Sequence, residues 1–245
     1  MPPVGPVLGG DRLDERALAS ALDWWRELGV DAPVREEPVA WLDRGKAARA
    51  PEPATPAAAP TPALPDDLEA FRAWLAEAAD LPFAAPDAPR VLPAGDPAAG
   101  LMVLAGMPGS DDLADGRPLG GEAGRLFDRM LAAIGRSRDT IYLSPLSCHR
   151  CPSGRFSVDE ERRCAELARR HVALAAPRAL LLLGDAPCRQ LLGTPLVKAR
   201  GAWRDVALPG GVVPAVASFA PDTLLAQPAL KRGAWADLQR LMERC

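Results

Sequence analysis

A glycine-rich loop is the first part of the sequence whose residue types favour a ligand site. The stretch LMVLAGMPGSDDLADGRPLGGEAG, residues 101–124, begins as an apolar run, turns at Pro108-Gly109 and continues through glycines toward a helix. Many α/β proteins build a ligand site in such a loop at the end of a strand. Glycine suits this role because it lets the backbone approach a phosphate or a base closely.

Three cysteines form a second group that could do chemistry. Cys148, Cys151 and Cys164 stand close in the sequence with His149, and such ligands can bind zinc. One short Cys-x-x-Cys with a single further cysteine is also typical of thiols that pack as small apolar residues, and we favour that interpretation. The sequence has five cysteines and begins without the pattern of a secretory signal, so we expect neither disulfides nor export.

The elements that must position these residues alternate along the chain. Short apolar runs predict strands, and amphipathic stretches between them predict helices. This order predicts a three-layer α/β/α sandwich with a central, mainly parallel four-stranded sheet and a site at the carboxyl ends of its strands. The expected strands are GLMVLAG, TIYLSPL, RALLLLGD and VVPAVASF, and the expected helices include AGRLFDRMLAAIG, VDEERRCAELARRHVALAA and APCRQLLG.

The N-terminal part has a different composition. Residues 11–30 place apolar side chains at helical spacing, and the Pro/Ala-rich stretch that follows has the composition of a linker. We therefore expect a helical extension over 1–45, a linker over 46–65 and an α/β/α domain over 66–245, whose first helix spans about 66–79 and is capped by Asp66 or Asp67.

The distribution of charge and the hydropathy of the sequence indicate which kinds of partner the protein could contact. Residues 101–245 carry 20 Lys and Arg against 15 Asp and Glu, a net charge of +5, whereas residues 1–100 carry 9 against 17. This excess permits contact with nucleic acid and is equally typical of solvated helix faces. No apolar run reaches the roughly 18 residues of a membrane span. We expect a monomeric cytoplasmic protein.

Long segments resemble one family. GMPGSDDLADGRPLGGEAGRLFDRMLAAIGRSRDTIYLSPL, residues 106–146, resembles the bacterial uracil-DNA glycosylases of the thermostable, iron–sulfur type, often called family 4. SVDEERRCAELARRHVALAAPRALLLLGDAPCRQLLG, RGAWRDV and PAVASFAPDTLLAQPALKRGAWADL look like its later segments, in its order. The resemblance implies DNA binding and base-excision repair, in which a uracil nucleotide is turned out of the duplex into a pocket.

Four positions of the implied pocket carry unexpected residues. Gly106 stands where the family has its catalytic acid, and Leu119 where a phenylalanine stacks on uracil. Pro145 replaces the asparagine that contacts the uracil edge, and Ala220 replaces the histidine that stabilises the departing uracil. Losing one electrostatic group of this kind costs roughly two to three orders of magnitude in rate. We therefore expect a degenerate member with weak or no uracil excision and leave open whether it is an enzyme.

Two alternatives remain open. The protein could be an active glycosylase on uracil or another damaged base, with a relocated acid at Asp111, Asp112 or Asp222. It could also be a non-enzymatic interaction protein whose N-terminal helix, with Trp24 and Trp25, binds another protein.

The resemblance also assigns residues that keep the loop and contact DNA. The implied base pocket comprises Met107, Pro108, Gly109, Leu119 and Ser144. The implied DNA contacts are Arg117, Gly124, Leu224, Leu225, Lys231 and Arg232, with the two leucines at the place of an apolar wedge or simply in the core.

The family's iron–sulfur cluster needs four cysteines, two of them before the first strand. The corresponding stretch LAEAADLPFAAPDAPRV has none, so we expect the cluster to be lost and the protein to have no cofactor.

Overall fold

The computed structural model describes residues 64–85, 87–151 and 156–244. All of them lie in one of the chain's two units, Pro62–Cys245. The predicted N-terminal helix and nearly all of the predicted linker lie outside the described residues.

Four parallel strands form the centre of the sheet, in the order β3-β2-β4-β6. They arise from the four apolar runs expected from the sequence: β2, β3 and β4 are buried along their whole length, and β6 is buried over 215–218. Val103 of β2 pairs with Leu143 of β3 on one side and with Leu181 of β4 on the other. The strands are β2 (Leu101–Ala105), β3 (Tyr142–Pro145), β4 (Ala179–Leu183) and β6 (Gly211–Ser218).

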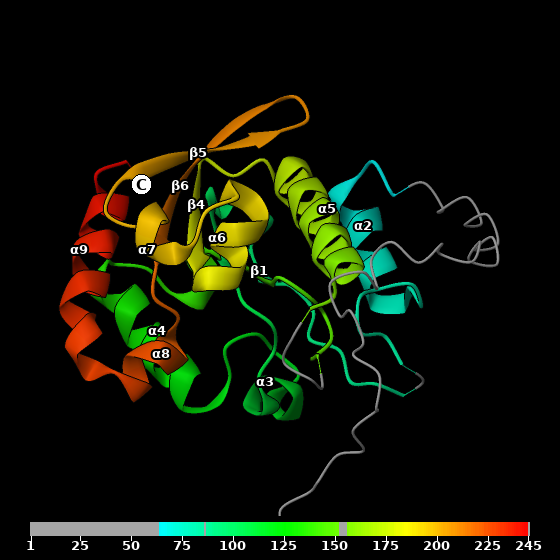
Figure 1. The fold of residues 1–245 in the computed structure, drawn as a ribbon, viewed down its shortest axis with the longest axis horizontal. Coiled ribbons are helices and arrows are strands. Elements are labelled where there is room, and N and C mark those ends of the chain that lie inside the picture. Colours follow the sequence, from blue (N-terminus) through cyan, green and yellow to red (C-terminus); the bar gives the residue numbers. More distant parts are fainter. Residues whose placement is uncertain (1–63, 86, 152–155, 245) are drawn as a thin grey trace, which may run out of the picture. The chain divides into compact units, whose positions relative to one another are not determined.

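The sheet has six strands in total, so the prediction of four was too low. β1 (Ala94–Gly95) pairs antiparallel with β3, and β5 (Trp203–Leu208) pairs antiparallel with β6. β1 is only two residues long, and β5 is an edge strand with exposed charged side chains, so neither has the apolar run of a central strand. Figure 1 shows the β5–β6 hairpin, in orange, extending beyond the helices.

Helices cover both faces of the sheet, which confirms the layered α/β architecture (Figure 1). Leu101 and Val103 of β2 belong to one apolar cluster, and the alternate residues Met102 and Leu104 belong to the other. The first cluster contains residues of α4 (Gly121–Ala133) and α9 (Lys231–Met242). The second contains residues of α5 (Val158–Ala175), α6 (Asp185–Leu192) and α7 (Leu196–Ala199).

Helix α2 (Leu68–Glu77) lies beside α5 and begins at the N-cap Asp67, whose carboxylate accepts the Ala70 N–H at 3.0 Å. Of the two aspartates considered as caps, Asp67 therefore fills that role. The remaining elements are α3 (Ser110–Asp115), α8 (Pro221–Ala226), η2 (Pro97–Ala99), η3 (Arg138–Thr140) and η4 (Pro228–Leu230). Among the described helices, none is long and apolar enough to cross a membrane.

The connections place a crevice at the carboxyl ends of the strands. After β2 the chain passes to β3 on one side, and then returns to β4 on the other side of β2. In open α/β sheets such a reversal of strand order marks the usual place of a ligand site.

Candidate functional site

A cavity of about 390 Å³ lies where β2, β4 and β6 end. Three segments surround it: the loop after β2 with α3, the turn between β4 and α6, and the start of α8. Its lining residues are Ala105, Gly106, Met107, Gly109, Ser110, Asp111, Asp112, Leu119, Gly120, Ala123, Leu183, Gly184, Asp185, Ala186, Pro187, Ala220, Pro221, Asp222 and Thr223.

Most of the catalytic and base-pocket candidates selected from the sequence meet at this cavity. Gly106, Leu119 and Ala220, three of the four replaced positions, line it together. The three candidate acids Asp111, Asp112 and Asp222 line it as well, as do Met107 and Gly109 of the expected base pocket. Pro108, Ser144 and Pro145 are not part of this lining.

Gly106 leaves room at the floor of the cavity. A Cβ built on Gly106 would meet no heavy atom within 4 Å. Ala220 borders the end of β4, since a Cβ on Gly184 would lie 3.3 Å from the Ala220 Cβ. An acid at position 106 and a larger side chain at position 220 would therefore both project at the margin of one hollow.

The Asp112 carboxylate connects the two ends of the loop after β2 through hydrogen bonds. Its carboxylate accepts the backbone N–H of Gly109 at 3.0 Å and that of Gly120 at 2.6 Å. Asp115 similarly accepts the N–H of Gly121 at 3.3 Å. These carboxylates from α3 satisfy donors at the start of α4, so the positive end of that helix already has anionic partners. Asp112 is thus tied to the backbone on both carboxylate oxygens.

Leu119 is held in an unusual backbone conformation, with φ at 54°, in the left-handed region. Arg138 donates to the carbonyl oxygens of Pro118 at 2.8 Å and Leu119 at 2.6 Å. Gly124 packs against Leu119, and a Cβ on Gly124 would overlap the Leu119 carbonyl oxygen. Gly124 is buried and packs against the loop, and its expected contact with DNA stays a prediction.

Asp185 is a cavity residue that sequence reasoning missed. It begins α6 directly after the end of β4, and the only signal is the Gly184-Asp185 pair behind an apolar strand. Burial raises the pKa of Asp185. The hydrogen bond and the charge of Arg189 lower it, as does the Leu196 N–H, which donates to the Asp185 carboxylate at 2.8 Å. The net pKa of Asp185 lies below its usual value.

Asp111 and Asp222 are the less constrained carboxylates. Both are exposed in part to solvent while lining the cavity. Within the described part of the chain, neither forms a hydrogen bond or ion pair of the kind that holds Asp112 and Asp185.

Ser144 belongs to a buried network on the other face of the sheet. His171 lies between two β3 side chains, with Nε2 2.8 Å from the Tyr142 hydroxyl and Nδ1 3.3 Å from the Ser144 Oγ. Ser144 in turn donates to the Pro145 carbonyl at 3.0 Å. Burial raises the pKa of Tyr142 to about 12 and lowers that of His171 to about 3. The network ties α5 to β3 and turns Ser144 away from the large cavity.

The cysteines behave as core residues. Burial raises the pKa of the Cys148, Cys164 and Cys188 thiols to about 12. Cys151 is also buried, and His149 Nδ1 lies 3.2 Å from the Pro89 carbonyl. Among the residues that the structure describes, no three His, Cys, Asp or Glu side chains are grouped so that they could hold a metal ion.

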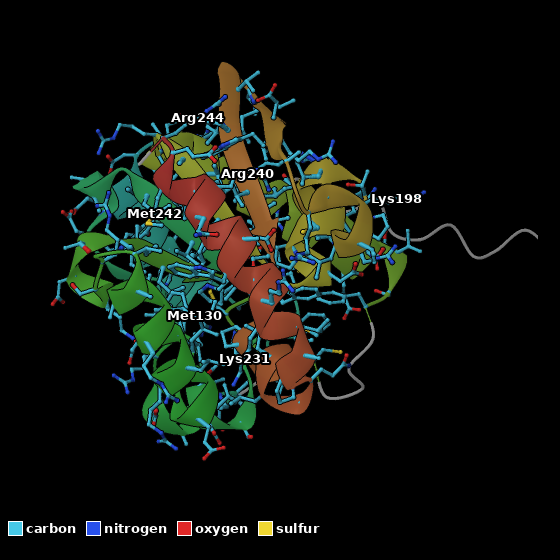
Figure 2. The ribbon with its side chains drawn as sticks, turned by 90° about the vertical axis from the view of Figure 1, so that its left-hand side faces the viewer. Met130, Lys198, Lys231, Arg240, Met242 and Arg244 are labelled. Carbon is cyan, nitrogen blue, oxygen red and sulfur yellow. The ribbon has the colours of Figure 1, made fainter. Side chains whose placement is uncertain are left out.

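The expected DNA contacts differ in exposure. Leu224 is 1% exposed and Leu225 is 37% exposed, so only Leu225 presents its side chain at the surface. Arg117 is exposed, with its Nε 3.7 Å from Asp115. Lys231 and Arg232 begin α9, and Figure 2 shows Lys231 at one end of that helix, with Met130 of α4 nearby. Lys231 and Met130 line a groove of about 290 Å³ that also includes Trp235, and Arg232 is not part of that lining.

Comparison with known proteins shows the superfamily to which the chain belongs. The sequence profile of the Uracil DNA glycosylase superfamily matches residues 92–239, more than half of the chain, so the chain belongs to that superfamily. It is similar to the type-4 uracil-DNA glycosylase of Archaeoglobus fulgidus, with 26% identity over 158 residues that cover 62% of this chain and 79% of that protein. It is also similar to the type-4 uracil-DNA glycosylase of Sulfurisphaera tokodaii, with 29% identity over 92 residues, 37% of this chain and 42% of that protein. The resemblance inferred from the sequence is thereby confirmed.

Proposed function

We propose that this chain binds DNA and receives an extruded base in the cavity at the ends of β2, β4 and β6, with weak or no excision of uracil. The observation that carries the proposal is the lining of this cavity. Gly106, Leu119 and Ala220 meet there, and none of them has a titratable or hydrogen-bonding side chain. At these three positions of one shared site, the side chains that the resemblance assigns to uracil binding and departure are thus missing.

Pro145 adds a second reason. It ends β3 and is buried, and it lines a separate cavity of about 20 Å³ on the side of His171. Proline has no N–H to donate and no polar side chain. Its ring and its backbone nitrogen therefore offer no donor to the edge of a pyrimidine, and its carbonyl oxygen already accepts from the Ser144 hydroxyl.

The geometry gives some support to a second candidate, an active glycosylase with a relocated acid. Asp111 and Asp222 border the cavity from two different segments, α3 and α8, and are not tied down as Asp112 is. Either carboxylate is in a position to face a sugar at the cavity mouth. Asp112 is less suited to this role, because it already accepts two backbone N–H groups.

For the DNA-binding surface, we infer contacts from Arg117, Leu225, Lys231 and Arg232. The three charged side chains are exposed and can meet phosphates. Leu225 is the exposed member of the leucine pair and is the better candidate for an apolar wedge.

We also infer that the protein folds without an iron–sulfur cluster. Leu81, from the segment that precedes β1, is 6% exposed and packs in one apolar cluster with Cys148 and Leu167. The cysteines of the described residues supply no donors from that segment. The residues present therefore do not fit a cluster with two cysteine ligands before the first strand.

Iron analysis tests this inference. Protein purified anaerobically should contain no stoichiometric iron and show no visible absorbance band, and its melting temperature should not change on treatment with a chelator. Stoichiometric iron that is lost together with Cys148→Ala would contradict the inference.

The proposed function is tested by measuring binding and excision on the same oligonucleotides. The full chain should bind single- or double-stranded DNA with an affinity that falls as salt rises, because phosphate contacts release counterions. Replacing Lys231 and Arg232 together by Gln should weaken binding and reduce the salt dependence by about two counterions. Uracil release should stay near the level without protein. Absence of DNA binding would contradict the proposal and favour the interaction protein.

A further inference from the structure

The cavity that we propose as the base site has an unusual charge for a pocket that must release an anion. Four carboxylates line it, Asp111, Asp112, Asp185 and Asp222, and its described lining includes no Lys, Arg or His. Asp112 and Asp185 are partly compensated by backbone N–H groups and by Arg189. Asp111 and Asp222 form no hydrogen bond or ion pair among the described residues, so the side chains that line the cavity carry a net negative charge.

This potential opposes the chemistry of uracil excision. Uracil leaves the sugar with negative charge, and nearby carboxylates raise the energy of the transition state in which that charge develops. The same carboxylates favour a base that is already a cation. A purine alkylated at a ring nitrogen is such a base, because the extra substituent gives the ring a positive charge.

The bond changes are simple for a cationic base. The oxygen of a water molecule bonds to the sugar C1′ while the C1′–N bond breaks. The electron pair of the broken bond stays on the base nitrogen. The base leaves as a neutral molecule, and the water proton passes to a carboxylate or to solvent. In the transition state the positive charge moves from base to sugar without ever becoming negative, so neighbouring carboxylates remain favourable throughout. No group that stabilises an anion is needed, which suits a site with Ala220.

The size of the cavity points in the same direction. Gly106, Leu119 and Ala220 are each smaller than the side chain that the family resemblance implies at that position. Together they border a hollow of about 390 Å³, and no atom occupies the space beside Gly106 within 4 Å of a Cβ position. The space lost by these side chains is available to a purine.

We propose that the cavity accepts an N-alkylated, cationic purine turned out of DNA, and that Asp111 and Asp222 select it by charge. This inference rests on the proposed function, since it requires that an extruded base reaches the cavity. It names the class of base that the site takes.

The test uses the full chain and matched duplexes that contain one 7-methylguanine, one guanine or one uracil. Released base is measured and corrected for spontaneous depurination without protein. We expect 7-methylguanine to be released at least about tenfold faster than uracil, and guanine not at all. Asp111→Asn and Asp222→Asn should each lower the rate, and the double variant should lower it by about a hundredfold. Asp205→Asn, on the exposed edge strand β5, is the matched control and should have no effect.

The outcomes separate this inference from the proposed function. Binding to all three duplexes without preferential release of 7-methylguanine would overturn the inference and leave DNA binding intact. Release that is insensitive to both aspartate variants would overturn the selecting role of these carboxylates. Failure to bind any duplex would contradict the proposed function itself. Unfolding curves of the single variants, which alter one exposed side chain each, show whether a loss of activity reflects a loss of folding.

Discussion

Single residues of the loop after β2 divide into those that build the loop and those that face the cavity. Asp112 joins Gly109 to Gly120 through two backbone hydrogen bonds, and Arg138 fixes Leu119 through its carbonyl. These contacts fix the backbone of the loop beside the cavity, to which Gly106 and Leu119 present no titratable side chain.

Gly106 of the loop and Gly124 of α4 should respond differently to the same substitution. Gly124→Ala places a methyl group against the Leu119 carbonyl and should destabilise the protein by about 2 kcal/mol or more. Gly106→Ala, the matched control, points into open space at a φ outside the left-handed region, and should change stability by about 0.5 kcal/mol or less. Urea unfolding measures both. Equal effects would mean that Gly124 is not packed as described.

Several single residues that line the cavity could be selected from the sequence. The family resemblance assigned Gly106 and Ala220 to one pocket, and both line the same cavity, although β4 separates β2 from β6 in the sheet. Ser144 was placed in the base pocket, but alternation along β3 turns it to the other face, toward His171. Asp185 was missed because a Gly-Asp pair before a helix is ordinary N-terminal chemistry, and only the fold shows that it borders a cavity.

Among the elements, α5 is fastened to β3 by a buried polar network. One direction of donation satisfies the whole network: Tyr142 donates to His171 Nε2, Nδ1–H donates to Ser144, and Ser144 donates to the Pro145 carbonyl. His171 must be neutral for this arrangement, in agreement with its lowered pKa. The network positions β3, whose end lies beside the end of β2.

This network predicts acid sensitivity. His171 has its pKa lowered from 6.5 to about 3 in the folded protein, so below pH 6.5 the unfolded chain binds a proton that the folded chain does not. The free energy of unfolding should therefore fall as pH falls from about 6.5 toward 3, by up to about 1.4 kcal/mol per pH unit from this residue.

The comparison variant is His171→Gln, which keeps hydrogen-bonding capacity but cannot titrate. Its free energy of unfolding, measured in urea from pH 7 to pH 4, should depend less steeply on pH than that of the wild type. Identical slopes would contradict the buried neutral state of His171.

The four central strands could be predicted from their apolar runs, whereas β1 and β5 could not. β1 has two residues, and β5 is an edge strand in which only Val206 is buried. Such elements are specified by their neighbours in the sheet more than by their own composition.

At the scale of the whole molecule, residues 92–239 match the superfamily, and the layered α/β fold has a cavity at the ends of its central strands. We propose that this cavity still receives an extruded base and that its capacity to expel uracil is lost. The N-terminal extension over 1–45, its linker over 46–65, a monomeric state and a cytoplasmic location stay predictions from the sequence.

The rate of uracil release from oligonucleotides tests this account most directly, measured for the wild type and for the double variant Gly106→Glu with Ala220→His. The wild type should release uracil at or near the rate without protein. The double variant places an acid in open space and a donor at the cavity margin, and it should exceed the wild type by at least about tenfold. Efficient release by the wild type, unimproved in the double variant, would contradict the account.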